Sequence, residues 1–364
     1  MLFDINDSLP LVFGYLTLVE LVRVDMAVLN RACREVWLLA LQRLPPLIFD
    51  RMRFTHDKLR WIISRDIRRL TVLQLEHARP VGLRESSFLG CCWPALDVLD
   101  LCGPRVRQQQ STFFTPVYPP PVSEKIFLSN IYHITASSPG LRSVNLDGES
   151  MESLDTALDM LTQRCPSLDS VSVEGSGLAL RNSALVSLSR LPLLHSLSLQ
   201  GASGITDQGL ALFLTVEPET PHSSSSEGED EDEDVEGMER RLLSLLPRPI
   251  SLRSLNLNQC AKISTVGMKL LAAACSTLHS LALADVVHVT DEAITVIAAR
   301  NPQLKELVLN RCYRIGDAAL RALYRHCPCL GELRVEGCVN VTDDCVTTLR
   351  TREQPKGVPC LVWI

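Results

Sequence analysis

A leucine motif that returns every 26 residues is the strongest constraint on how this chain folds. The stretches LRSLNLNQC, LHSLALA, LKELVLNRC and LGELRVEGC begin at Leu252, Leu278, Leu304 and Leu330. A fixed period of this length is typical of stacked repeats, in which each unit contacts only its neighbours. Because stacked repeats present one continuous surface, the period also predicts a protein that holds a partner along that surface.

The motif extends toward the N-terminus and gives ten copies in all. Six further copies start at Leu44, Leu70, Leu96, Leu141, Leu168 and Leu194. Two intervals exceed the period by more than one residue, and each of these excesses falls on a change of composition, at 103–123 (proline- and glutamine-rich) and at 215–249 (SSSSEGEDEDEDVE). Neither insert can bury apolar surface, so we expect both to lie outside the repeats, the second as disordered chain.

Each repeat is expected to contain a short strand, a turn and a helix. Alternate side chains of a strand point to opposite faces, so inward Leu255 and Leu257 would leave Ser254, Asn256 and Asn258 on the open face. By the same phase, Asp147 would be exposed on that face.

The helices have start and stop signals. The predicted caps are Thr206-Asp207, Thr290-Asp291, Gly316-Asp317 and Thr342-Asp343, and Pro166, Pro302 and Pro328 are expected to end helices. Helical spacing predicts an apolar face that includes Leu320, Leu323 and Tyr324.

The pattern LxxLxLxxCxxITDxGLxxLxxxCPxL resembles the cysteine-containing class of leucine-rich repeats, most closely over 252–345. The resemblance implies an α/β leucine-rich-repeat solenoid (horseshoe) over 44–354, with strands on the concave face and helices on the convex face. Residues 355–364 are expected to form a C-terminal cap, in which Leu361 and Trp363 make a last strand.

Composition and cysteine usage exclude several classes of protein. The net charge is −6, but the run 227–236 contains eight carboxylates and no base, and the rest of the chain has a formal charge of +2. We therefore expect no nucleic acid partner. The start MLFDIND carries acid where a secretory signal has base, and no apolar run is long enough to span a bilayer. We expect no membrane association and a cytoplasmic or nuclear location.

The 13 cysteines follow the repeat, where they are expected to act as compact hydrophobic residues. Their odd number argues against a disulfide framework, and without a CxxC pair we expect no metal site and no cofactor. Cys360 has four residues after it, so a prenylation box is not expected. No P-loop, GxSxG or HExxH motif occurs, so we expect a non-catalytic protein.

Segment 1–43 differs from the repeats because its apolar residues have helical spacing. It resembles the F-box, a three-helix motif. Leu9, Val12, Phe13, Tyr15 and Leu16 match its first part, Glu20-Leu21 its acidic-leucine pair, and 30–37 its aromatic-ended helix. Leu9-Pro10 lies nearer to Phe13 than in the family, and Val28–Arg31 replaces the usual Cys-Lys-x-Trp. The alternative is that these helices only cap the solenoid.

The resemblance implies a substrate-recognition subunit of a Skp-cullin-F-box ubiquitin ligase, bound through a Skp-type adaptor to cullin and RING subunits. The implied adaptor-binding residues are Leu9, Pro10, Phe13, Leu16, Leu21 and Val24. The alternative function is a repeat scaffold or inhibitor that binds one protein and recruits no ligase.

Strand phase places the substrate-binding residues on the open face, at Ser254, Asn256, Asn258, Asn310, Glu332, Arg334 and Glu336. We expect an extended or basic protein segment to bind there, with its cationic part near Glu332 and Glu336. The alternative is that these are merely solvated strand residues.

The acidic run also has two interpretations. It is a solvated linker, or else a decoy for basic partners or a regulated loop. Ser224 and Ser226 each have a glutamate three residues on, which suits an acidophilic kinase.

Overall fold

The computed structural model describes residues 47–52, 70–75, 88–101, 124–148, 153–215, 247–351 and 360–363. They fall into two compact units, residues 1–145 and 146–364. Segment 1–43 with its predicted adaptor-binding residues, the insert 103–123 and residues 216–246 of the second insert lie outside the described residues.

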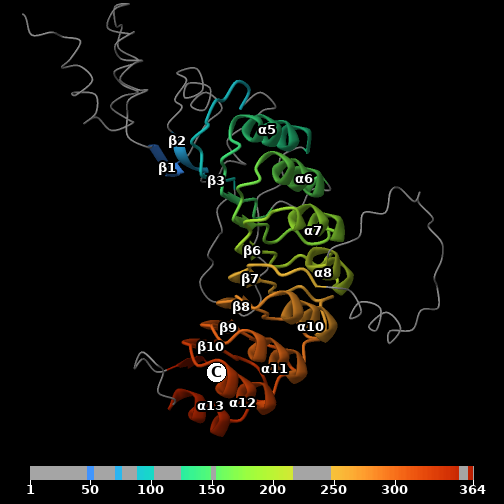
Figure 1. Ribbon diagram of the computed structural model, residues 1–364, viewed down its shortest axis with the longest axis vertical. Helices are drawn as coiled ribbons and strands as arrows, with labels where there is room; N and C mark the ends of the chain where they lie inside the picture. Colours follow the sequence, from blue (N-terminus) through green and yellow to red (C-terminus); the bar gives the residue numbers. More distant parts are fainter. Residues whose placement is uncertain are drawn as a thin grey trace, which may run out of the picture. The chain divides into compact units, whose positions relative to one another are not determined.

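In the first unit the described residues form four parallel strands and one helix (Figure 1). The strands pair in chain order, and they are β1 (Leu47–Met52), β2 (Leu70–Leu75), β3 (Val98–Asp100) and β4 (Ser143–Asn145). The helix α5 (Glu124–Ser137) lies between β3 and β4 in the sequence. Fully buried Phe88 and Trp93 meet edge to face, with ring centroids 5.9 Å apart.

The second unit alternates short strands with helices, and its strands also pair in parallel and in chain order. Its elements are α6 (Leu154–Arg164), β5 (Ser170–Ser172), α7 (Asn182–Ser189), β6 (Ser196–Ser198), α8 (Asp207–Leu214), β7 (Ser254–Asn256), α10 (Thr265–Ala274), β8 (Ser280–Ala282), α11 (Asp291–Arg300), β9 (Glu306–Val308), α12 (Asp317–His326), β10 (Glu332–Arg334), α13 (Asp343–Arg350) and β11 (Leu361–Trp363). Strands form one layer and helices the other, which makes an open solenoid (Figure 1).

The leucine motif explains the core between these layers. Leu255 and Leu257 are 2% and 0% exposed, whereas Ser254 and Asn256 are partly exposed, as the strand phase predicts. Burial of one leucine side chain contributes about 2 kcal/mol. One helix prediction is wrong: Tyr324 is 43% exposed, because it lies one position beyond the buried Leu320 and Leu323 stripe of α12.

The polar residues at the helix starts connect neighbouring repeats. In five cases the first or second helical residue accepts a hydrogen bond from the backbone N–H of the next helix's N-cap residue. These acceptor and donor pairs are Asp155 and Arg181, Asn182 and Thr206, Asp207 and Ser264, Asp291 and Gly316, and Asp317 and Thr342, at 2.7–3.3 Å. Between α10 and α11 the hydroxyls of Thr265 and Thr290 bond instead, at 2.9 Å. We call this series the helix-start ladder.

The helix-start ladder corrects the predicted caps. Thr206, Thr290, Gly316 and Thr342 are N-cap residues, as predicted, but none caps its own helix with a side chain. Ser264, the N-cap residue of α10, does cap its own helix, since its hydroxyl accepts from Val266 N–H at 3.1 Å. The aspartates therefore join repeats, and they also place negative charge at helix N-termini, where the helix dipole favours it.

Buried cysteines make a second connection between repeats. The thiols of Cys260, Cys312 and Cys338 donate to Leu199, Leu283 and Leu309 carbonyls at 3.2, 3.1 and 3.0 Å. All cysteines in the described ranges are free, and most are buried, as expected for compact apolar residues.

We predict that Asp317→Ala uncouples the last helix. Its carboxylate accepts from both the Thr342 N–H and the Thr342 hydroxyl, and the first of these bonds lowers its pKa below the ordinary value. Because the folded pKa is lowered, this stabilisation is present above about pH 4 and is lost as pH falls through the folded pKa. Urea unfolding at pH 6 should show a loss of about 1 kcal/mol that shrinks toward pH 3. The exposed Asp344 is the control, and an equal effect of Asp344→Ala would refute the assignment.

Thiol labelling tests the burial of the cysteines. Burial raises the pKa of Cys260, Cys275 and Cys312 to about 12, so their reactive thiolate is scarce. In the native protein at pH 8, iodoacetamide should label exposed Cys92 and Cys329 first, and the three buried thiols only after unfolding, as read by peptide mass spectrometry. Fast native labelling of Cys312 would contradict this.

Candidate partner-binding face

The exposed side chains between the buried leucines of β5–β11 form a continuous surface, which we call the strand face. Strand register sets them in rows, with neighbours about 4.8 Å apart. One row is Ser170, Ser196, Ser254, Ser280, Glu306, Glu332 and Leu361; the next is Ser172, Ser198, Asn256, Ala282, Val308, Arg334 and Trp363. The rows bring the predicted residues of β7 and β10 onto one surface.

The predicted residues of β7 belong to a polar network. Asn256 Nδ2 donates to Glu174 at 3.4 Å and to Gln200 at 3.3 Å, while its Oδ1 accepts from Asn258 N–H at 3.1 Å. Ser198 also donates to Glu174, at 2.8 Å. Asn256 therefore holds three repeats together, whereas the Ser254 hydroxyl has no hydrogen bond in the described part of the chain.

Asn258 and Asn310 sit where their strands end, and both bond to the next repeat. Asn258 Oδ1 accepts from Ala284 N–H at 2.7 Å, and Asn310 Oδ1 accepts from Glu336 N–H at 3.1 Å. Asn310 Nδ2 also donates to Glu336, at 3.3 Å. Their carbonyl oxygens are thus occupied, although both side chains remain partly exposed to a partner.

The C-terminal part of the strand face is acidic. Register places Glu306 beside Glu332, and the Arg334 guanidinium lies 2.6 Å from Glu332. Glu336 follows two residues after the end of β10, and Arg334 is half exposed. Like charges on neighbouring strands repel each other, so a cation brought by a partner would find a favourable position here.

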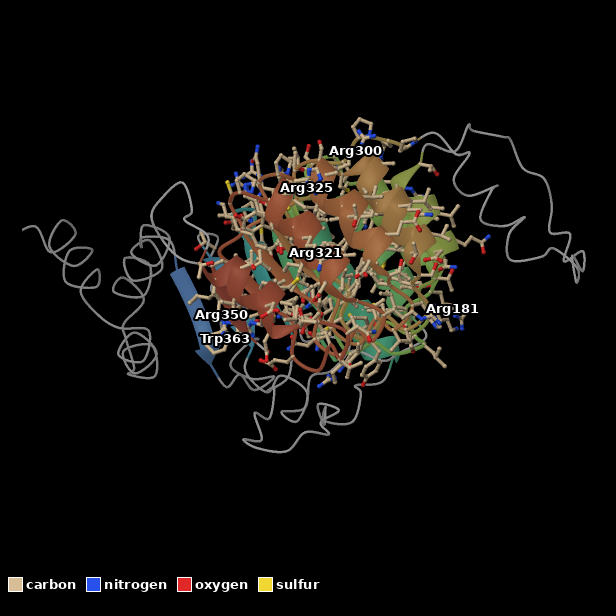
Figure 2. All side chains as sticks on the ribbon, turned by 90° about the horizontal axis from the view of Figure 1, so that it is seen from below. Arg181, Arg300, Arg321, Arg325, Arg350 and Trp363 are labelled. Atoms are coloured by element: carbon tan, nitrogen blue, oxygen red, sulfur yellow. The ribbon has the colours of Figure 1, made fainter. Side chains whose placement is uncertain are left out.

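An apolar pair that strand phase did not assign to binding adjoins these carboxylates. β11 is parallel to β10, as predicted for the last strand, with Leu361 beside Glu332 and Trp363 beside Arg334. Their side chains are 55% and 51% exposed, and Figure 2 labels Trp363. The sequence feature that could have indicated this pair is the alternation in Leu361–Trp363, because the residues on either side of an inward Val362 point to the open face. Exposed Trp is common among residues that dominate protein interfaces.

The turns after three neighbouring strands contain strained residues. Gln259, Asp285 and Arg311 have φ of 62, 62 and 58°, whereas Gly175, Gly201 and Gly337 occupy this position in other repeats. A side chain in this left-handed region costs about 1 kcal/mol. Arg311 makes a two-point ion pair with Asp285, which raises the pKa of the guanidinium. The ion pair adds fixed charge beside the strand face.

One residue predicted on this face lies in the interior instead. Asp147 is 0% exposed, and its Oδ1 accepts from the Ser172 hydroxyl at 2.5 Å and from Glu174 N–H at 2.9 Å. These two donors compensate for the loss of water around the carboxylate.

No cluster of three or more His, Cys, Asp or Glu in the described ranges is arranged to hold a metal ion. No described helix combines the length and apolarity that a membrane crossing needs. The predicted adaptor-binding residues fall in 1–43, outside the described residues, so that site stays a prediction.

Comparison with known proteins identifies the repeat. A family model described as a leucine-rich repeat matches residues 249–272, and no curated protein matches the sequence significantly. The fold is similar to a chain in the crystal structure of the yeast Rad7 and Elc1 complex, with a TM-score of 0.50 and 17% identity, covering 99% of this chain and 92% of that one. LegL7 of Legionella pneumophila gives a TM-score of 0.43 and 12% identity over 81% and 85% of the two chains. The 26-residue period, the strand-and-helix solenoid and the matched repeat show that the chain folds as a leucine-rich-repeat solenoid, and the likeness to the yeast chain agrees with this fold.

Proposed function

We propose that this leucine-rich-repeat protein is the substrate-recognition subunit of a Skp-cullin-F-box ubiquitin ligase. Segment 1–43 binds a Skp-type adaptor and through it cullin and RING subunits, while the strand face holds a protein substrate. The observation that carries the proposal is the order of parts, an F-box-like segment followed directly by a repeat array with an open face.

The strand face supports a binding role because it combines an apolar anchor with charge. Leu361 and Trp363 lie beside Glu332 and Arg334, and Glu336 follows two residues after the end of β10. An exposed aromatic residue surrounded by polar groups is the usual arrangement of a protein interaction site. A substrate that fits is an extended segment with an apolar side chain followed by lysine or arginine.

In this role the protein contributes proximity and no bond chemistry. A receptor that holds substrate and ubiquitin donor in one assembly raises the effective concentration of substrate lysines near the donor. Bonds between repeats hold the strand face in place, so little conformational entropy is lost when a substrate binds.

The alternative is a scaffold or inhibitor that uses the same face without a ligase. The departures of segment 1–43 from the F-box pattern favour it, since a solenoid also needs an N-terminal cap.

Affinity purification of the full chain separates the two functions. The adaptor and cullin should copurify with the wild type, and Leu9→Ala/Pro10→Ala/Phe13→Ala should lose both, because truncation of a central apolar contact costs about 2 kcal/mol or more. Absence of adaptor and cullin from the wild-type material, with circular dichroism showing a folded chain, contradicts the ligase proposal.

Charge reversal tests the acidic part of the strand face. Glu332→Lys/Glu336→Lys should lower the recovery of basic copurifying proteins about tenfold, and adaptor recovery should not change, because the proposed adaptor-binding residues belong to a different segment of the sequence. Asp344→Lys, an exposed reversal on α13, is the matched control. Equal recovery of these proteins with both variants would exclude the acidic residues as binding groups.

A further inference from the structure

Between α7 and β10, one edge of the second unit is rich in basic residues. We define the return edge as the segments that lead from the end of each helix to the next strand between α7 and β10, namely 190–195, 247–253, 275–279, 300–305 and 326–331. They contain no Asp or Glu, and their basic residues are Arg190, His195, Arg248, Arg253, His279, Arg300, Lys305 and His326.

Four of these residues form a column along the strand starts. Arg253 N–H donates to His195 O, His279 N–H to Arg253 O, and Lys305 N–H to His279 O, at 2.7–2.8 Å. The column spans three strand spacings, about 14 Å. Arg253 and Lys305 are exposed. His279 Nδ1 lies 2.8 Å from Thr277 O, which leaves Nε2 available to a partner.

Two arginines extend this positive surface over the helix ends. Arg300 is the last residue of α11, and Arg325 lies in the last turn of α12. Figure 2 shows both toward one edge, with Arg181, which precedes α7, toward the other. Helix dipoles favour a base at each helix C-terminus, but they do not account for Arg253 and Lys305 at strand starts. Arg253, Arg300, Lys305 and Arg325 form no ion pair in the described part of the chain.

The acidic insert begins and ends at this same edge. Thr215 follows α8 and forms an antiparallel bridge with Pro247, and Arg248 N–H donates to Leu214 O at 2.7 Å. Thr215 and Pro247, which flank 216–246 in the sequence, therefore lie together, and Pro247 is six residues before Arg253.

We propose that the return edge binds the chain's own acidic run, 227–236. Six consecutive carboxylates, Glu229–Asp234, face a column that four or five extended residues can cover, at about 3.3 Å each. Residues 237–246, which separate the run from Pro247, reach about 35 Å when extended, enough to cover the distance to Arg253 and Lys305.

Because 237–246 tethers the acidic run to the return edge, the proposed contact can form although each of its ion pairs would be exposed to solvent. Exposed ion pairs are individually weak, but a short tether supplies an effective concentration in the millimolar range, and several pairs act together. Any other polyanion that approaches the return edge then has to displace the run. This inference does not depend on the proposed ligase function.

Zero-length carbodiimide cross-linking of the intact chain tests the proposal, because it joins a lysine to a carboxylate in direct contact. Lys305 is the reporter, and exposed Lys262, in the turn between β7 and α10, is the control on the opposite edge. In low salt, cross-links from 227–236 should form at Lys305 at least about threefold more than at Lys262, and 0.5 M NaCl should remove the difference by screening. Equal yields at the two lysines would overturn the proposal.

Variants and isotopes complete the test. Arg253→Glu and, separately, Arg300→Glu should each lower the Lys305 cross-link about threefold, and the second serves if the first fails to fold. An unchanged yield in a folded variant overturns the proposal.

A mixture of isotopically light and heavy protein tests whether the contact forms within one chain. Each cross-linked peptide pair should then be all light or all heavy. Pairs that combine a light and a heavy peptide would show that a second copy supplies the run, and they would overturn the intramolecular contact.

Discussion

Hydrogen bonds between neighbouring repeats are the interaction on which the second unit depends. A single repeat cannot enclose its own leucines, so each needs the next one to cover them. Parallel strand bonds, the helix-start ladder and the cysteine thiols all cross the same boundary. Together they fix how each repeat lies on the next. These bonds also determine the geometry of the strand face, because its side chains project from strands whose register they set.

The period and phase of the leucines predicted most of this fold. Successive side chains of a strand point to opposite faces, so Leu255 and Leu257 lie on the same face, and that face has to be the buried one. The same reasoning could not assign hydrogen-bond partners. A carboxylate such as Asp207 can cap its own helix or join the next repeat, and the sequence looks the same in both cases. Asp147 was misplaced for a related reason: Ser172, a repeat further along, supplies the donor that makes its burial tolerable.

The predicted binding residues fall into two groups, those whose polar atoms bond to other residues of the solenoid and those that remain exposed to a partner. Asn258 and Asn310 use their side-chain oxygens, and Asn256 its side-chain nitrogen, to hold neighbouring repeats, so all three shape the strand face more than they offer it free groups. Glu332 and Arg334 remain partly exposed, and β11 adds the apolar pair that strand phase did not assign to binding. Charge is distributed by position, with carboxylates at helix starts and on the last strands and bases along the return edge. A leucine-rich-repeat solenoid with these surfaces is suited to bind a protein partner.

Amide hydrogen exchange tests most directly whether the repeats are coupled through side chains as well as backbone. The amides of Ser264 and Ala284 donate to Asp207 and Asn258 of the preceding repeat. The account predicts that both exchange as slowly as amides within the neighbouring strands, and that Asp207→Ala releases Ser264 without releasing Ala284. Exchange of both amides at the rate of an unfolded chain in the wild-type protein would contradict the account.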